Sequence, residues 1–354
     1  MATTIDEARV EQFMGQIVVD LGAAITAPLV MLGDQLGLYR AMAHAGPLTS
    51  AEIAERAGVR ERYVREWLAN QAASGYIEHD QRTDRYTLPD EHALALADED
   101  SPLYVMGAYG ILASVWADEE RIADRFRRGE GFGWHEHDSR LFAGTERFFR
   151  PGYRAHLVAD WIPAFDGLEQ RMREGASVVD VGCGHGASTI IMAQAFPQSR
   201  FLGVDYHEGS IARARELARD AGLEDRVRFE VAAADAYPGD GYDLVCHFDC
   251  LHDMGDPVGA ARHARETLKP DGWWMLVEPY AGDSLEDNLN PVGRLFYAAS
   301  TVICTPSSLA QDVALGLGAQ AGEARLAAVA QEAGFSRFRR ATETPFNLVL
   351  EGRP

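Results

Sequence analysis

The sequence predicts an α/β fold in which a doubly wound, mostly parallel sheet follows a smaller, mostly helical domain. Two observations carry this prediction. An apolar run, Val178–Val181, leads directly into a turn with three alternating glycines, and a second run, Phe201–Val204, ends at Asp205. Such a turn lets a ligand lie against the backbone, and an acid about twenty residues later is placed to accept hydrogen bonds from a ribose. The 354 residues are enough for two domains with a substantial core.

Helix and turn signals organise the first hundred residues. Apolar residues at helical spacing predict a packed helix from Pro28 to about Ala43, with Pro28 near its start. The next helix is expected to take Thr49 or Ser50 as its N-cap and to end at Gly58, where a positive φ would form a helix-turn-helix corner. A further helix and two short strands complete a winged helix, and they are expected at Glu61–Ser74, Tyr76–Glu78 and Arg85–Leu88.

Seven strands are expected in the second domain. Five apolar runs and a terminal pair supply them, at Val178–Val181, Phe201–Asp205, Val227–Val231, Tyr242–Phe248, Trp273–Glu278, residues 334–340 and Phe346–Leu350. The expected organisation is a winged-helix and dimerisation domain at 1–100, a helical linker and substrate wall at 101–175, and a ligand-binding sheet domain at 176–354.

The glycine turn by itself has two interpretations. Gly182, Gly184 and Ala187 fit the G-x-G-x-x-G/A pattern of dinucleotide-binding proteins, with Asp205 as the ribose-binding acid. The alternative is a turn built on Gly182, Gly184 and Gly186, with Asp180 inside the preceding strand. A carboxylate at position 180 would repel a nearby phosphate and suits a cationic ligand better.

The second pattern, D-x-G-x-G-x-G, resembles the class I S-adenosylmethionine-dependent methyltransferases. Leu251-His252-Asp253 followed by Asp256, and Leu268-Lys269-Pro270-Asp271-Gly272, resemble segments of small-molecule O-methyltransferases that carry a winged-helix dimerisation domain. The resemblance implies a seven-stranded Rossmann-like methyltransferase domain, with S-adenosylmethionine as cofactor and S-adenosylhomocysteine (SAH) as its product. The cofactor-binding residues that it implies are Asp180, Gly182, Gly184, Gly186, Asp205, Tyr206, Asp235, Ala236, Phe248 and Tyr153.

His252 is the candidate general base for methylation of a hydroxyl. An imidazole titrates near neutral pH, and position 252 follows the fourth strand at its carboxyl end, where open α/β sheets bind ligands. It also coincides with the catalytic histidine of the O-methyltransferases that the chain resembles. Asp253 and Glu278 are candidates to orient or stabilise the imidazole. The alternative is that His252 caps the following helix and Asp253 braces a loop. Met254 stands where the related enzymes usually carry tryptophan, and Phe248 stands where plant-type enzymes are often polar.

Aromatic residues are candidates for the acceptor site. Phe148, Phe149 and Tyr153 either close over cofactor and acceptor or form a helix-packing core. Phe296 and Tyr297, in a helix expected to begin near Asn290, either face the acceptor or pack. His135-Glu136-His137-Asp138 is interpreted as a polar loop, and no metal site is expected, because no second ligand group stands at a familiar spacing.

Composition restricts the partners. A formal charge of −21 disfavours nucleic acid and anionic membranes, which bind clustered Lys and Arg. The four cysteines show no C-x-x-C spacing, which fits a reducing cytoplasm. No signal peptide and no apolar run of membrane-spanning length is expected. The predicted partners are a small-molecule acceptor and, by resemblance, a second copy in a homodimer.

Three functions remain open from the sequence. The first is a methyltransferase, most simply an O-methyltransferase acting on an aromatic or secondary metabolite with His252 as base. The second is a winged-helix transcriptional regulator that binds the cofactor or a metabolite without turnover. In that case Arg60, Arg62 and Arg65 would face DNA, although Glu61 and Glu66 balance them. The third is a nicotinamide-dependent oxidoreductase using the same glycines.

Overall fold

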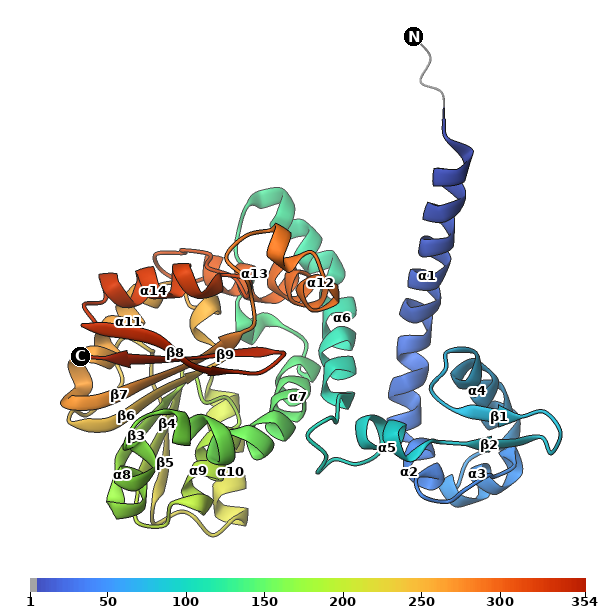
Figure 1. Cartoon of the computed structure of the whole chain (residues 1–354), viewed down its shortest axis with the longest axis horizontal. Coiled ribbons are helices and arrows are strands. Elements are labelled where there is room, and N and C mark those ends of the chain that lie inside the picture. The colour runs from blue at the N-terminus through green and yellow to red at the C-terminus, as the bar shows by residue number, and fades with distance from the viewer. Residues whose placement is uncertain (1–4) are drawn as a thin grey trace. The chain divides into compact units, whose positions relative to one another are not determined.

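The computed structural model describes residues 5–354, which form two compact units, one ending at Ala113 and the other beginning at Ser114. The helix α6 (Met106–Arg128) runs across this boundary (Figure 1). The stretch 101–175 therefore belongs partly to each unit. Its proposed role as a separate linker and substrate wall stays a prediction.

The first unit contains the helix-turn-helix and wing. Thr49 caps α3 with a capping box, since its side chain accepts from the Glu52 N–H while Glu52 accepts from the Thr49 N–H. Gly58, with φ of 68°, ends that helix as expected. The elements of this unit are α1 (Glu7–Gln35), α2 (Leu38–Met42), α3 (Ser50–Ala57), α4 (Glu61–Ala73), β1 (Glu78–Asp80), β2 (Arg85–Thr87) and α5 (Asp90–Leu96). The paired strands β1 and β2 form the wing.

The start of the first helix was wrong in the sequence prediction. Helix α1 begins at Glu7, with Asp6 as its N-cap, and Pro28 lies inside it. A proline inside a helix removes one backbone hydrogen bond but does not always end the helix. The helical spacing after Pro28 marks only the part that packs, because the buried residues of α1 all lie between Thr26 and Asp34.

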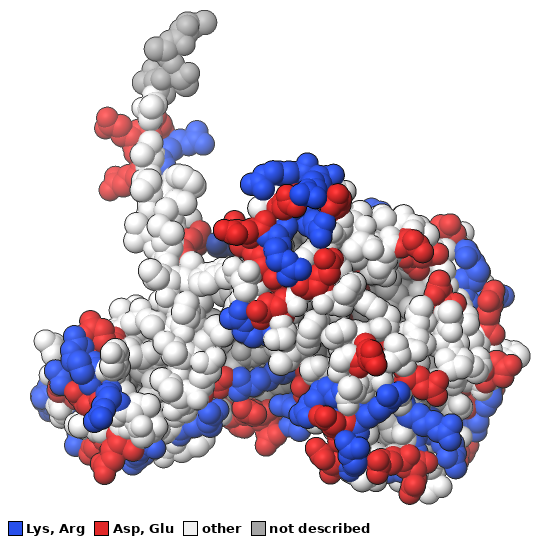
Figure 2. Space-filling view, turned by 180° about the vertical axis from the view of Figure 1, so that it is seen from behind, with Lys and Arg blue, Asp and Glu red and all other residues white. Residues whose placement is uncertain are grey.

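The first two-thirds of α1 are apolar and exposed. Phe13, Val18, Val19, Leu21 and Ile25 each have more than half of their surface accessible. Figure 2 shows few charges along this helix, whereas acidic and basic side chains intersperse over the visible face of the second unit. By length and composition alone α1 could cross a membrane, although its longest stretch without a charged residue, Leu21–Gly33, is shorter than a membrane span. A helix that packs against a partner helix passes the same test.

A seven-stranded sheet forms the second unit. Its order is β5-β4-β3-β6-β7-β9-β8, and the pairs from β5 to β7 are parallel while β9 runs antiparallel to β7 and β8. The strands are β3 (Ser177–Val181), β4 (Arg200–Asp205), β5 (Val227–Val231), β6 (Tyr242–Phe248), β7 (Leu268–Pro279), β8 (Arg337–Glu343) and β9 (Asn347–Arg353). The seven expected strands are therefore confirmed.

Helices cover both faces of this sheet. One core packs α8 (Leu168–Gly175), α9 (Ala187–Ala195) and α10 (Glu208–Asp220) on one face. A second core packs α11 (Pro257–Thr267) and α14 (Gly322–Glu332) on the other (Figure 1). Because β4 and β6 flank β3, the chain reverses its winding direction there. Open α/β sheets bind ligands beyond the carboxyl ends of the strands at such a point.

Further helical segments complete the second unit. They are η1 (Trp134–Glu136), α7 (Arg140–His156), η2 (Leu157–Trp161), η3 (Ile162–Ala164), η4 (Leu251–Asp253), η5 (Glu286–Asn288), α12 (Pro291–Ala299), η6 (Ser300–Cys304) and α13 (Thr305–Leu309). We call the end of the sheet where β3, β4, β6 and β7 terminate the carboxyl edge.

Candidate functional site

The three glycines of the turn after β3 have different surroundings. Gly182, Gly184 and Gly186 all have positive φ, at 71°, 53° and 78°. A Cβ at Gly182 would meet the Cys250 sulfur at 2.8 Å, and one at Gly186 would meet the Phe229 ring at 2.5 Å. Nothing lies within 4 Å of the equivalent position at Gly184. Gly182 and Gly186 are thus required by packing, whereas Gly184 leaves its backbone open to a ligand.

Asp180 is fully buried beneath this turn, and only one of its two carboxylate oxygens has hydrogen-bond partners. Its Oδ2 accepts from the hydroxyls of Ser188 and Thr189, both at 2.6 Å, which anchors the start of α9. Its Oδ1 has no partner among the described residues. Burial raises the pKa of Asp180 to about 6, against the opposing effect of the two hydroxyls. An unpartnered buried carboxylate oxygen is a suitable partner for a cationic group.

Asp205 ties two loops together at the end of β4. Its carboxylate accepts from the backbone N–H of Gly184 at 3.0 Å and from that of His207 at 2.8 Å. Burial raises its pKa, although those N–H groups oppose the rise. Beside it, Tyr206 is 43% exposed. Asp235 and Ala236 lie exposed in the turn that follows β5. These predicted cofactor contacts therefore follow neighbouring strands, with Tyr206, Asp235 and Ala236 exposed and Asp205 largely buried.

Glu278 holds His252. The His252 Nδ1 lies 2.5 Å from the Glu278 Oε2, and the Leu251 N–H donates to the Glu278 Oε1 at 2.9 Å. Both side chains are buried. Burial lowers the pKa of the imidazole, but Glu278 and the Cys304 thiol, which also interacts with the ring, raise it well above its usual range. Glu278 thus fixes the ring through Nδ1.

Asp253 makes no side-chain hydrogen bond to His252 among the described residues, although its charge interacts with that of the imidazole. Burial raises the pKa of its carboxyl to about 7. Glu278 hydrogen-bonds the ring, because β7 ends directly beside the turn after β6, and a role of Asp253 in stabilising the imidazole stays a prediction.

Asp249 is a residue that the sequence interpretation missed. It follows β6 in a left-handed conformation with φ of 51°. Its carboxylate accepts from the Tyr153 hydroxyl at 3.1 Å and from the Asn347 side-chain amide at 2.9 Å. Burial, then the charge of Glu278, raises its pKa to about 8. A strained non-glycine residue at a strand end marks a candidate functional position. Its place directly after an apolar strand was the available sequence signal.

The predicted aromatic residues fall into two groups. Phe149 and Tyr153 stack with ring centroids 5.9 Å apart, Phe148 meets Phe149 edge-on, and Tyr153 meets Phe248 at 5.5 Å. Tyr153 and Phe248 also belong to the buried core. On α12, Phe296 is buried and Tyr297 half-buried, and among the described rings neither makes a contact with the first group. The structure thus brings four aromatics together near Asp249 and leaves the α12 pair apart.

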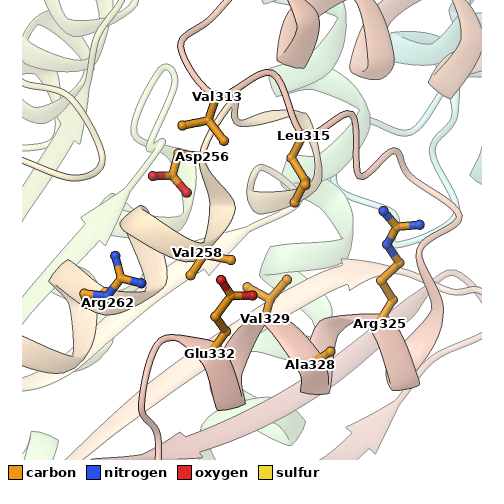
Figure 3. Close-up of a pocket in the computed structure, with 9 residues that line it drawn as sticks. All are labelled: Asp256, Val258, Arg262, Val313, Leu315, Arg325, Ala328, Val329 and Glu332. Carbon is orange, nitrogen blue, oxygen red and sulfur yellow. The ribbon is translucent and has the colours of Figure 1, made fainter.

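Two further features bear on ligands. In residues 5–354 no group of three or more His, Cys, Asp and Glu is arranged to hold a metal ion. A cavity of about 390 Å³ lies between α11, α14 and the turn at Val313 (Figure 3). Arg262 and Arg325 border it, with Asp256 and Glu332. None of the predicted site residues lines it, so this cavity is not part of the predicted site.

Similarities to known proteins follow the same division of the chain. Residues 23–98 match the family model described as an Rv2258c-like winged HTH domain, and residues 172–314 match one described as a methyltransferase domain. The chain joins a winged helix-turn-helix domain to a methyltransferase domain. This agrees with the resemblance drawn from the glycine turn and the Leu251-His252-Asp253 segment.

The curated relatives match about a third of this chain. One is 27-O-demethylrifamycin SV methyltransferase of Amycolatopsis mediterranei, 36% identical over 131 residues, which are 35% of this chain and 48% of that protein. Another is a ubiquinone biosynthesis O-methyltransferase of Leptothrix cholodnii, 32% identical over 135 residues, 37% of this chain and 54% of that protein. The chain therefore spans about half the length of these relatives.

Solved structures resemble the whole chain. Mitomycin 7-O-methyltransferase MmcR aligns with a TM-score of 0.69 and 23% identity, over 99% of this chain and 100% of that one. PigF with SAH aligns with a TM-score of 0.68 and 19% identity, over the same shares. At these identities the likeness concerns the fold, which is a methyltransferase domain preceded by a winged helix.

Proposed function

We propose that this protein is an S-adenosylmethionine-dependent methyltransferase that methylates a small-molecule acceptor, with O-methylation as the preferred reaction. The observation that carries the proposal is the charge of the carboxyl edge. Acidic side chains interact electrostatically there with one another and with the imidazoles of His252, His207 and His185. The acidic side chains are Asp180, Asp205, Asp249, Asp253 and Glu278. Such a site favours a cation and disfavours the pyrophosphate of a dinucleotide.

The residues present fit S-adenosylmethionine. Gly184 leaves the turn open, and the unpartnered Oδ1 of Asp180 suits its positively charged amino acid portion. We assign Asp205 to the ribose hydroxyls, Tyr206 to the adenine face, and Asp235 with Ala236 to the adenine edge. When bound, the cofactor supplies a methyl group on a positively charged sulfur. The protein must then position the acceptor and exclude water.

His252 is proposed as the general base. Glu278 holds the ring at Nδ1, so Nε2 is the nitrogen that we assign to accept the proton of an acceptor hydroxyl. The free protein favours the charged imidazole, which cannot act as a base. A cationic ligand nearby opposes that charge and returns the imidazole pKa toward the range in which the neutral ring is populated. Cofactor binding would thus prepare the base.

The regulator hypothesis rests on the winged helix-turn-helix match, but the charges of that unit do not support it. Arg65 pairs with Glu61, and Arg62 pairs with Glu66, each within one turn of α4. DNA binding requires cations that are available to phosphates. If the full chain bound DNA with an affinity that falls as the salt concentration rises, the regulator hypothesis would be favoured instead.

We further propose a homodimer and a cytoplasmic location. The exposed apolar side chains of α1, including Phe13 and Ile25, favour burial against a second copy. All four cysteines are free and buried. Association that persists after α1 is shortened would count against this use of the helix.

Calorimetry with S-adenosylmethionine, SAH and NAD tests the function. We expect the first two to bind and NAD not to bind. Turnover is then sought with a panel of phenolic and hydroxylated aromatic acceptors. The His252→Gln variant should lose most turnover and keep SAH affinity. Unchanged turnover in this variant would exclude His252 as the base.

A further inference from the structure

One segment of the chain binds the backbone of the His252 loop at four successive residues. The carbonyl of His252 accepts from the Gly318 N–H at 3.0 Å, and that of Gly255 accepts from the Leu315 N–H at 3.0 Å. Between them, the Asp253 carbonyl accepts from the Gln311 side chain at 3.0 Å. The Met254 carbonyl accepts from the Ser308 hydroxyl at 2.7 Å. We call residues Ser307–Gly318 the clasp segment.

The side chains of Gln311 and Ser308 each make hydrogen bonds both to the His252 loop and within the clasp segment. The Gln311 amide nitrogen also donates to the Ser307 carbonyl at 3.0 Å, and its oxygen accepts from the Gly255 N–H at 3.1 Å. The Ser308 hydroxyl accepts from the Gly316 N–H at 3.0 Å. Gln311 and Ser308 therefore connect the clasp segment to itself and to the loop at once.

The clasp segment holds a strained turn in order to make these contacts. Val313 and Ala314 have φ of 69° and 53°, a left-handed conformation that is an outlier for a β-branched residue. Burial does not account for it, since Val313 is 68% exposed. In Figure 3, Val313 lies close to Asp256, the residue that follows the loop. The strain directs the next N–H, that of Leu315, to the Gly255 carbonyl. Strain of this kind persists where the surrounding contacts demand it.

The clasp segment and the His252 loop also pack closely against each other. A Cβ at Gly255 would overlap the Asp312 carbonyl oxygen and the Gln311 Cβ. Upstream, η6 ends at Cys304, whose thiol interacts with the His252 ring. The chain from η6 through the clasp segment thus contacts both the side chain and the backbone of the His252 loop.

We infer that the clasp segment positions His252 for catalysis and that Gln311 and Ser308 are positioning residues. The inference rests on the proposed function, in which His252 is the base. Glu278 fixes the ring at Nδ1, but the ring keeps a defined orientation only if the backbone of the His252 loop is held as well. The clasp segment supplies that restraint, since it satisfies every carbonyl from His252 to Gly255.

Neighbouring serines offer a matched comparison. Ser307 and Ser308 are both fully buried, yet the Ser307 hydroxyl has no partner among the described residues, while the Ser308 hydroxyl has two. Ser308→Ala removes the hydrogen bond to the Met254 carbonyl in the loop. Ser307→Ala removes a buried hydroxyl that makes no contact with the loop. Gln311→Met provides a second variant at an exposed position, where misfolding is not expected. It keeps an unbranched side chain and removes the three amide hydrogen bonds.

The experiment measures hydrogen exchange of residues 251–256 and titrates the His252 ring by NMR in the full-length protein. The ring signal is assigned by its loss in His252→Gln. In Ser308→Ala and Gln311→Met, exchange should rise on the order of tenfold at these amides. The ring's proton affinity should fall by about tenfold, toward that of free histidine, as its contact with Glu278 loosens. Ser307→Ala should match the wild type in both.

Unchanged exchange and titration in both variants would overturn the inference, as would equal changes in Ser307→Ala. SAH affinity, measured in parallel, should stay within about twofold, since the clasp segment contributes none of the proposed cofactor contacts. If the wild type does not bind SAH, the proposed function fails, but the exchange comparison still decides whether the clasp segment fixes the loop. With an acceptor in hand, kcat should fall in the two variants while KM for the cofactor stays unchanged.

Discussion

Replacing Glu278 with glutamine removes the charge that holds His252 while keeping the shape of the side chain. The glutamine oxygen can still accept from the Leu251 N–H, now 2.9 Å from Oε1. Its amide nitrogen would face the His252 Nδ1 and can only donate to it, so the ring proton must move to Nε2. An imidazole protonated at Nε2 cannot accept a proton from the substrate.

The expected loss follows from that change of tautomer. General base catalysis contributes about 10²–10⁴-fold to a rate, which corresponds to about 3–5 kcal/mol of transition-state stabilisation. We expect turnover of Glu278→Gln to fall within that range. Stability should fall by a smaller amount, about 1–3 kcal/mol, because a neutral hydrogen bond replaces the charge-assisted one between Glu278 and the ring, while the volume is conserved. SAH affinity should change little, since both Glu278 oxygens bind within the protein.

The assay compares kcat, SAH affinity and the free energy of unfolding with those of Glu351→Gln. Glu351 is also a buried carboxylate of the same sheet, but it pairs with Arg339 and Arg353 away from the carboxyl edge. This control should lose stability and keep turnover. If Glu278→Gln loses stability to the same extent and keeps its turnover, the role assigned to Glu278 is wrong.

Three other predictions concern the carboxyl edge. Gly184→Ala should weaken SAH binding at least tenfold by closing the open position and straining its φ, whereas Gly186→Ala should chiefly lower stability, by about 1–3 kcal/mol, as measured by chemical denaturation. Asp249→Asn should raise the stability of the free protein at pH 8 and weaken SAH binding; an unchanged affinity would remove Asp249 from the site. Finally, the pKa values of about 6, 7 and 8 for Asp180, Asp253 and Asp249 lie above those of unfolded carboxyls. The native state therefore holds extra protons at these three sites, so their contribution to stability should be fully present below about pH 4 and decline as pH rises through 6 to 8. Thermal unfolding across this range tests the sign, and a rise in stability over it would contradict the assignment.

Local patterns in the sequence were sufficient for the sheet and for the glycine turn. The strands are short apolar runs that can each be recognised locally. The roles of Thr49, Gly58 and Gly182 depend on the cap or turn in which each residue lies, so a short sequence pattern is enough to predict them. The extent of α1 was missed because its exposed half is apolar without a repeating buried face.

Long-range contacts account for the rest of what the sequence left open. Asp249 is defined by Tyr153 and Asn347, which lie 96 and 98 residues away. Gln311 reaches the His252 loop across 58 residues. No periodicity or spacing reveals such partners. The hydrogen bond between Glu278 and the His252 ring likewise needed the register between β6 and β7.

The account depends on a cationic sulfur nucleoside at the carboxyl edge, and calorimetric titration of the full chain tests this most directly. We predict that S-adenosylmethionine binds at one site per chain and releases protons, so that the measured heat varies with the ionisation enthalpy of the buffer. NAD should give no heat. Binding of NAD without any response to S-adenosylmethionine would contradict the account.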